Sequence, residues 1–375
     1  MRILLLADIH IGSIKDSKYV YDIITGIIDK ELILTHSDMV VILGDYFDRL
    51  CKVNEDCVSL AIDVMSYLIR ACVRENTKIR IVYGTESHEM NQYKLFNYHF
   101  TSSNVDIKIF DTVTEECVNG HPILYVPEEY VSDNIKHYSK FMNSSKRYDY
   151  VFGHGIIEDG MPSIVSSSHE RMKTGEKQVP KFKSGQLSAI SKICVFGHYH
   201  VHTKMDDDVY YLGSLFRNSF GEEVPKYYGI INDDKIEFIE NKDAYVYKTY
   251  EFDHKSDIYD SSDRIIDIIN QIKSDNADVF NGDKFGKIRL VLNMPMGMDA
   301  SFKDNLRNIL ANESQIVSLI KEPNDELLND IKEDLDDEYD WLIDPSLDVV
   351  DKLYRYISMN PDNHITLDQL KKYLK

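Results

Sequence analysis

Six histidine and aspartate residues stand in short motifs, each of which follows a run of apolar residues. In chain order they are Asp8, His10, Asp45, His154, His198 and His200. Imidazole and carboxylate groups bind divalent metal ions, and a donor set without thiolates favours manganese, iron or zinc over copper and leaves magnesium possible. Two ions that share a carboxylate can activate water and hold a phosphate group. The pattern therefore predicts a two-metal site for phosphate-ester chemistry, with Asp45 as the shared ligand.

The motifs divide the remaining ligands between the two ions. We expect Asp8, His10 and His200 to complete the first site. We expect His154 and His198 to complete the second site, together with a residue from the loop that follows the third apolar run.

The apolar runs predict the elements that position these ligands. Residues 2–7, 39–43 and 79–83 are expected to be buried strands, and the helical periodicity of residues 19–34 and 58–73 predicts two helices. Strands that alternate with helices are typical of βαβ units and a largely parallel sheet. Such sheets place their sites at the carboxyl ends of the strands, which is where the motifs lie.

The strands predicted in the later part of the chain are shorter than the first three. Residues 209–212, 227–231 and 235–239 are separated by Asp and Gly turns, and this spacing predicts an antiparallel second sheet. Residues 156–188 are mostly polar and are expected to form a long loop near the site.

The length of 375 residues favours a large domain with smaller modules. We expect three parts, which are residues 1–251, 252–321 and 322–375. The second part has the pattern of a small α+β domain, with helices at residues 262–272 and 299–310 and a strand at residues 287–293. The third begins with an acidic stretch and ends in two amphipathic helices, whose apolar faces serve either the protein's own core or a partner.

The amino-acid composition excludes several classes of protein. No run of about 18 apolar residues occurs and the first apolar run is too short for a signal peptide, so we expect a cytoplasmic protein without a membrane span. The five cysteines form no C-x-x-C pair, which argues against a disulfide framework and a zinc ribbon. The net charge of -20 argues against a broad basic surface for nucleic acid. It is compatible with a nuclease, because bound cations invert the local field where a phosphate sits.

Five motifs resemble those of a known family. They are D-x-H at residues 8–10, G-D-x-x-D at 44–48, a Gly-to-His-Glu loop at 84–89, G-H at 153–154 and G-H-x-H at 197–200. Together they resemble the calcineurin-like metallophosphoesterase superfamily over roughly residues 1–240. The resemblance implies an α/β fold, namely a four-layer α/β/β/α sandwich with a small α+β cap domain and a C-terminal helical tail. It also implies two divalent ions, with Mn²⁺ first and Mg²⁺, Fe or Zn as alternatives.

The resemblance also assigns roles near the loop at residues 84–89. It makes His88 the proton donor to the leaving oxygen, with Asp48 as the carboxylate that orients it. The family has an asparagine ligand directly before this histidine, and Ser87 stands in that place here, with Glu86 as a rival. Because a hydroxyl is a different ligand from an amide oxygen, we expect the second ion to bind more weakly than the first.

Residues 211–222 resemble the Y-x-G-S...S-F-x-E segment of the SbcD-type DNA repair nucleases of prokaryotes and phages. Within this segment Arg217 is a candidate substrate-binding residue. The resemblance implies a Mn²⁺-dependent exonuclease or endonuclease subunit that acts on DNA in recombination and repair. It also implies an SMC-like coiled-coil ATPase as the partner, and it leaves open whether the chain forms a homodimer.

Two alternatives remain. Residues 44–49 also resemble a protein phosphatase motif, which would fit a phosphoprotein phosphatase or a small phosphodiesterase. The segment at residues 211–222 and the modules beyond residue 252 argue against that alternative. The altered loop at residues 84–89 would instead fit a non-catalytic scaffold subunit of a nuclease complex.

Overall fold

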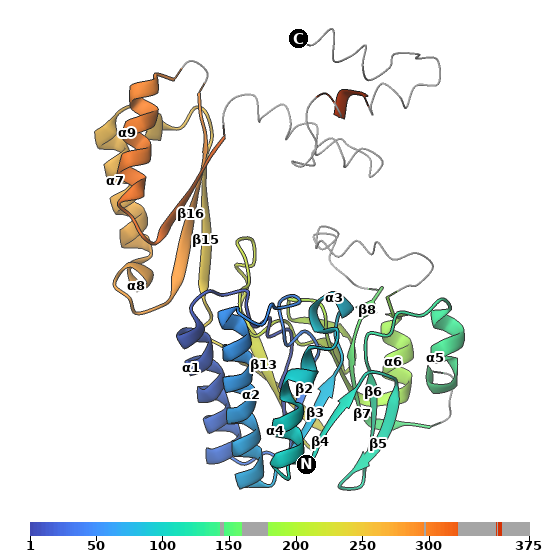
Figure 1. Cartoon of the computed structure of the whole chain (residues 1–375). Coiled ribbons are helices and arrows are strands. Elements are labelled where there is room, and N and C mark those ends of the chain that lie inside the picture. The colour runs from blue at the N-terminus through green and yellow to red at the C-terminus, as the bar shows by residue number, and fades with distance from the viewer. Residues whose placement is uncertain (143–145, 160–178, 296–297, 322–349, 351, 355–375) are drawn as a thin grey trace, which may run out of the picture. The chain divides into compact units, whose positions relative to one another are not determined.

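The computed structural model describes residues 1–142, 146–159, 179–295, 298–321, 350 and 352–354 (Figure 1). The chain divides into two compact units, which are Met1–Lys248 with Asp278–Gly286 and Thr249–Ala277 with Lys287–Lys375. The predicted domain boundaries at residues 251 and 321 stay predictions. The predicted acidic stretch and the two tail helices lie outside the described residues, apart from a few positions near residue 350.

Six strands form the first sheet, in the order β14-β13-β1-β2-β3-β4. They are β14 (Lys235–Glu240), β13 (Tyr227–Asn232), β1 (Arg2–Leu6), β2 (Met39–Leu43), β3 (Lys78–Val82) and β4 (Ile107–Phe110). Strands β1 to β4 run parallel, and β13 and β14 add antiparallel pairs at one edge. Strand β2 is buried along its whole length, as expected for a strand that is covered on both faces.

The second sheet has the order β11-β12-β10-β7-β6-β5. Its strands are β11 (Thr203–Asp206), β12 (Val209–Tyr211), β10 (Ser191–Gly197), β7 (Tyr148–His154), β6 (His121–Val126) and β5 (Thr114–Val118). The prediction of an antiparallel second sheet is wrong, because the four central strands are parallel and only the edge strands β5 and β11 are antiparallel. The strands at residues 227–231 and 235–239 belong to the first sheet instead.

Helices cover the outer faces of the two sheets (Figure 1). On the first sheet lie α1 (Ser17–Ile28), the π-helix Asp29–Leu34, α2 (Asp56–Glu75), the 3-10 helix Gln92–Phe96 and α4 (Asn97–Ser102); on the second lie α5 (Asn134–Met142) and α6 (Ser184–Ile190). Alternate residues of each central strand pack on opposite sides: Leu4 faces the α1 and α2 side, and Leu5 packs between the sheets with Val195. The predicted four-layer α/β/β/α sandwich is therefore confirmed.

The second unit is a small α+β module. It contains most of β15 (Val246–Phe252) and β16 (Gly286–Asn293), with β17 (Ile316–Lys321), α7 (Ser262–Asp275) and α9 (Ala300–Ala311). The short helix α8 (Ala277–Phe280) lies where the two units divide. Ser261 caps the N-terminus of α7, and its hydroxyl accepts a hydrogen bond from the backbone amide of Arg264 at 3.1 Å. Its buried residues Ile265 and Ile269, with Leu306 of α9, give the module its own apolar core.

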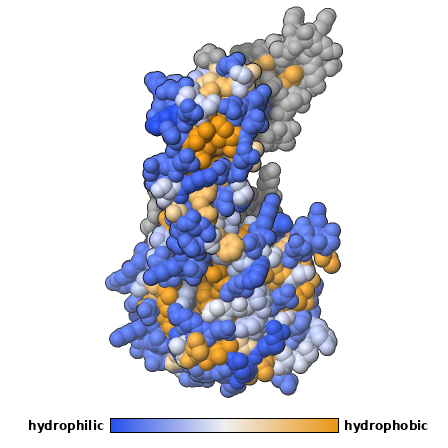
Figure 2. Space-filling view, turned by 90° about the vertical axis from the view of Figure 1, so that its left-hand side faces the viewer, coloured by the Kyte–Doolittle hydropathy of each residue, from blue (hydrophilic) through white to orange (hydrophobic). Residues whose placement is uncertain are grey.

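The surface and the cysteines agree with the composition. Hydrophilic residues cover most of the face shown in Figure 2, with smaller apolar patches between them. Among the described residues, no helix combines the length and the apolar character that crossing a membrane requires. The five cysteines, all within the described part of the chain, are thiols and not disulfides.

Candidate metal centre

The carboxyl ends of strands from both sheets carry the predicted ligands. Asp8 follows β1, Asp45 follows β2, His154 ends β7 and His198 follows β10. Asp8, Asp45 and His198 have positive φ angles of 46°, 47° and 91°. Such conformations cost a non-glycine residue about 1–3 kcal/mol and persist where surrounding structure enforces them, often at functional sites.

Two glycines allow the motif backbones to approach closely. A Cβ atom on Gly44, whose φ is 75°, would overlap the imidazole of His154, and one on Gly84 would overlap Asp45. The backbone amide of His10 donates to the carbonyl of Asp45 at 3.0 Å, which ties the first two motifs together.

The structure brings the six predicted ligands into adjoining groups. The ligand atoms of Asp8, His10 and His200 lie within 4.8 Å of one another, and Nε2 of His10 is 2.9 Å from Nε2 of His200. Nε2 of His154 is 3.2 Å from Oδ1 of Asp8 and 3.5 Å from Oδ2 of Asp45. Asp45 Oδ2 is also 3.9 Å from Nε2 of His10. Asp45 therefore lies where the two groups meet, the position expected of a shared ligand.

Burial and charge set the protonation of these groups. Burial opposes ionisation of Asp45, but the charge and hydrogen bond of His154 outweigh it and hold the pKa of Asp45 well below its usual range. Burial also disfavours the charged form of His154, yet Asp45 and Asp8 raise the pKa of His154 well above its usual range. Burial, followed by the charge of His200, lowers the pKa of His10 to about 3. A buried set of carboxylates and imidazoles fits divalent cations, which would replace the proton on His154.

The loop after β3 differs from the expectation for Ser87. Ser87 lies on the short helix α3 (Glu86–Glu89), and both it and Glu86 are exposed. Thr85 is buried instead; its amide donates to Oδ1 of Asp45 at 2.7 Å and its hydroxyl to Oδ2 at 3.2 Å. Counting forward from Gly84, and not backward from the histidine, would have placed Thr85 at the asparagine position. Ser87 as a ligand stays a prediction that this geometry does not favour.

Two buried glutamates lie beside the predicted ligands; Glu128 was not predicted, and Glu89 was predicted only as a member of the loop motif at residues 84–89. Glu128 follows β6, and its Oε2 lies 2.7 Å from Nδ1 of His154 and 3.2 Å from Nδ1 of His198. The available signal was a Pro-Glu pair directly after an apolar run, as at the other ligands. Glu89 accepts hydrogen bonds from the backbone amides of Gly84 at 2.6 Å and Tyr46 at 2.8 Å. It therefore holds the loop after β3 against the loop after β2.

The candidate proton donor contacts the candidate shared ligand. Nδ1 of His88 lies 3.1 Å from Oδ2 of Asp45. Asp48 forms an ion pair with Arg49, with its Oδ2 at 3.2 Å from Nη1, and its Oδ1 lies 3.9 Å from Nδ1 of His10. The role of Asp48 in orienting His88 stays a prediction.

The segment at residues 211–222 supports His200. Oε1 of Glu222 lies 3.4 Å from Nδ1 of His200, and Oε2 of Glu222 accepts a hydrogen bond from the buried Lys226 at 2.6 Å. Such outer carboxylates orient metal-binding imidazoles. Arg217 instead donates to the backbone carbonyls of Val224 and Ala244 at 3.0 and 3.1 Å. These contacts give Arg217 a structural role, and its contact with substrate stays a prediction.

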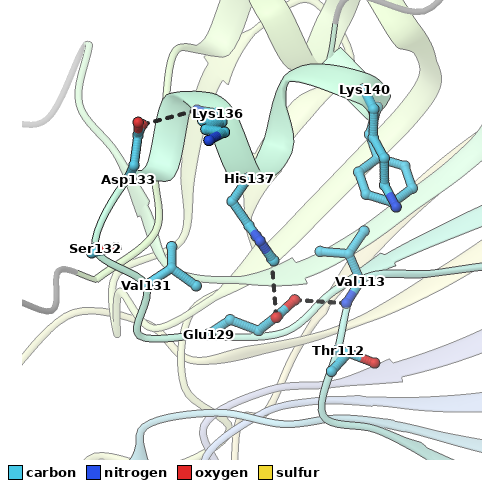
Figure 3. A pocket seen from close by; sticks show the side chains of 10 residues that line it. Thr112, Val113, Glu129, Val131, Ser132, Asp133, Lys136, His137 and Lys140 are labelled. Carbon is cyan, nitrogen blue, oxygen red and sulfur yellow. Dashed lines mark hydrogen bonds and ion pairs between the residues drawn. The ribbon is translucent and has the colours of Figure 1, made fainter.

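A separate cavity of about 660 Å³ lies beside α5 (Figure 3). Glu129 accepts a hydrogen bond from the amide of Val113 at 2.7 Å and lies 3.0 Å from Nε2 of His137. Lys136 and Lys140 add two cations to its lining. None of the candidate metal ligands lines this cavity.

A sequence model of the family described as calcineurin-like phosphoesterase matches residues 1–202, more than half of the chain. The chain belongs to the calcineurin-like phosphoesterase family. The match and the clustered ligands together support metal-dependent phosphoester hydrolysis, without identifying the metal. Matches to 46 chains of solved structures include one with a TM-score of 0.37 and 12% identity, over 64% of this chain and 98% of the other; similarity this low adds nothing on function. No curated protein matches the chain.

Proposed function

We propose that this phosphoesterase is a Mn²⁺-dependent DNA nuclease subunit that hydrolyses phosphodiesters at a two-metal centre. The observation that carries the proposal is the position of Asp45, whose Oδ2 lies 3.5 Å from Nε2 of His154 and 3.1 Å from Nδ1 of His88. One carboxylate thus joins the candidate metal ligands to the candidate proton donor. A two-metal hydrolysis of phosphate esters needs two ions held close together, and a shared carboxylate would hold them so.

Each residue of the centre has a distinct task in this proposal. Bound metal ions supply a nucleophilic water and neutralise charge on the phosphate. Six predicted ligands would hold these ions, namely Asp8, His10, Asp45, His154, His198 and His200. His88 donates a proton to the departing 3′ oxygen, and its Nδ1 lies 3.1 Å from Oδ2 of Asp45.

DNA as the substrate is supported by the nuclease-like segment. Glu222, the last residue of that segment, contacts His200, so the segment belongs to the centre and not to a remote surface. A chain with a net charge of -20 has little intrinsic attraction for DNA beyond the metal site. An SMC-like coiled-coil ATPase bound to the tail would supply DNA affinity, and this partner remains a proposal because the tail lies outside the described residues.

The test compares substrates on the purified protein with Mn²⁺, Mg²⁺ or chelator. We expect Mn²⁺-dependent hydrolysis of bis-p-nitrophenyl phosphate and of labelled single-stranded DNA, with slower hydrolysis of p-nitrophenyl phosphate. A preference for the monoester would favour the phosphatase alternative. Two bound ions without turnover on any of these substrates would favour the scaffold alternative.

A further inference from the structure

Two cysteines and a glutamate lie together where the chain enters α2. The Sγ atoms of Cys51 and Cys57 and a carboxylate oxygen of Glu55 are within 4.8 Å of one another. Within the described part of the chain, this is the one group of possible metal ligands that contains a thiol. None of its members belongs to the candidate metal centre, so its chemistry is separate from that of the aspartates and histidines.

The spacing of this group fits a single tetrahedral zinc ion. Sγ of Cys57 lies 3.5 Å from Oε2 of Glu55. Zn–S bonds of about 2.3 Å and Zn–O bonds of about 2.0–2.2 Å place the sulfur and oxygen ligands of one tetrahedral ion about 3.5 Å apart. Thiolates select zinc or copper(I), and the carboxylate, which is a harder donor, favours zinc.

Hydrogen bonds from the backbone hold two of these ligands in place. The amide of Lys52 donates to Oε2 of Glu55 at 3.2 Å, and the amide of Cys51 donates to Oε1 of Gln92 at 2.9 Å. Metal ligands in proteins are oriented by such outer contacts. The donor atoms therefore already lie close together before an ion binds.

Burial differs among the three residues. Cys57 is buried, and a Cβ atom on Gly12 would lie 3.1 Å from its Cβ, so the turn at Gly12 packs against this cysteine. Cys51 and Glu55 are partly exposed. An ion can therefore reach the group from the side of Cys51 and Glu55.

Arg49 completes the charge balance. Its Nη2 lies 3.3 Å from Oε2 of Glu55. Two thiolates and one carboxylate carry a charge of about -3, which a zinc ion and the guanidinium together neutralise. In the absence of a metal ion, burial and then the neighbouring Cys51 and Glu55 raise the pKa of the Cys57 thiol to about 12. A metal ion would displace that proton.

We propose that Cys51, Glu55 and Cys57 bind a zinc ion, with water in its fourth position. The ion would join the segment that follows the G-D-x-x-D motif to the first turn of α2. Arg49, which contacts Glu55, also pairs with Asp48 of that motif at 3.2 Å. This site goes beyond the proposed nuclease activity and does not depend on it.

A cobalt titration tests the site without a measurement of activity. Co²⁺ bound to thiolates gives a charge-transfer band in the near ultraviolet, whereas the six predicted ligands of the candidate metal centre include no thiolate. The unaltered protein, stripped of metal by chelator and kept reduced with a phosphine, should gain this band on addition of Co²⁺. Zn²⁺ should then abolish the band by displacing the cobalt.

Cysteine variants assign the band to this group. Cys51→Ser and Cys57→Ser should lose it, and Cys117→Ser, which changes an exposed cysteine of β5, is the matched control and should retain it. The absence of a band in the unaltered protein, or a band that persists in both Cys51→Ser and Cys57→Ser, would overturn the proposal. Glu55→Gln should need more Co²⁺ to reach the same band; an unchanged midpoint would exclude Glu55 as a ligand and overturn the three-residue site.

Alkylation of the unaltered protein keeps the test decisive if the change at the buried Cys57 prevents folding, as judged by circular dichroism. Zn²⁺ should slow the reaction of Cys51 with iodoacetamide and leave that of Cys117 unchanged, as measured by mass spectrometry. Equal rates at Cys51 with and without Zn²⁺ would contradict the site. A cobalt band in a protein that cleaves no diester would contradict the proposed function and leave this inference standing.

Discussion

Nδ1 of His88 lies 3.1 Å from Oδ2 of Asp45, although the two residues follow different strands. Strands β2 and β3 are parallel neighbours, so their carboxyl ends deliver both side chains to one place. The contact places the proton donor of the proposed reaction next to the carboxylate that we propose as the shared metal ligand. Substitution of His88 should lower turnover and leave metal binding intact, whereas substitution of Asp45 should lower both.

His88→Ala should lower kcat on DNA by about 100-fold or more, because the leaving oxygen loses its proton donor. Both metal ions should remain bound, because none of the six predicted metal ligands is changed. His121→Ala is the matched control and should leave kcat unchanged. His121 is the first residue of β6, at the end of the strand away from the metal centre, and it is paired with Asp149. Metal analysis that shows His88→Ala depleted of an ion would instead make His88 a ligand.

Gly44→Ala should abolish tight metal binding. A Cβ atom at this position would overlap the imidazole of His154, and a φ of 75° adds strain for any other residue. Gly120→Ala is the control, because Gly120 has a similar φ of 86° but open space around it. Calorimetry with Mn²⁺ should separate the two variants. Equal metal affinity in both would show that the close approach of the motifs is not required.

Glu116 should make the unfolding free energy depend on acid pH. Burial raises the pKa of Glu116, but hydrogen bonds from the buried Arg80 at 2.7 Å and from Lys108 outweigh it, so its folded pKa lies below the usual value. The stabilisation is therefore present above about pH 4.3, the unfolded pKa, and is lost as the pH falls through the folded pKa. We expect Glu116→Gln to cost about 2 kcal/mol at pH 7.

Urea unfolding of the metal-free protein between pH 7 and pH 3 checks this prediction. The unaltered protein should lose more stability than Glu116→Gln over the acid part of this range, so that the two curves converge. Glu237→Gln, at an exposed position of β14, is the control and should follow the unaltered protein. Curves for Glu116→Gln and the unaltered protein that stay parallel would mean that the pair with Arg80 does not govern acid stability.

The ligands at strand ends could be predicted because their signal is local. A buried strand such as β2 is a continuous apolar run, and Asp45 follows it within two residues. The sheet to which a short strand belongs is not a local property. Strand β13 is a short run with four consecutive buried residues and β14 mixes polar and apolar residues, and neither pattern names a sheet. The long-range pairing of β13 with β1 places both strands in the first sheet.

The altered loop shows a second limit of sequence reasoning. Because two extra residues lie between Gly84 and His88, the position of the family's asparagine depends on the end from which it is counted. Counting back from the histidine selects Ser87. The structure places the extra residues in the single turn of α3, which leaves Thr85 next to the strand and against Asp45. Glu128 was missed because it lies 43 residues along the chain from its contact Thr85, a distance that no motif spans.

The most direct test of the two-metal nuclease measures bound Mn²⁺ and cleavage of labelled single-stranded DNA on the same samples of the unaltered protein and Asp45→Asn. If Asp45 is shared by two catalytic ions, Asp45→Asn should lose bound Mn²⁺ and cleavage together while its circular dichroism spectrum is unchanged. Cleavage that persists in Asp45→Asn, or in the unaltered protein with excess chelator, would contradict a two-metal mechanism at this centre.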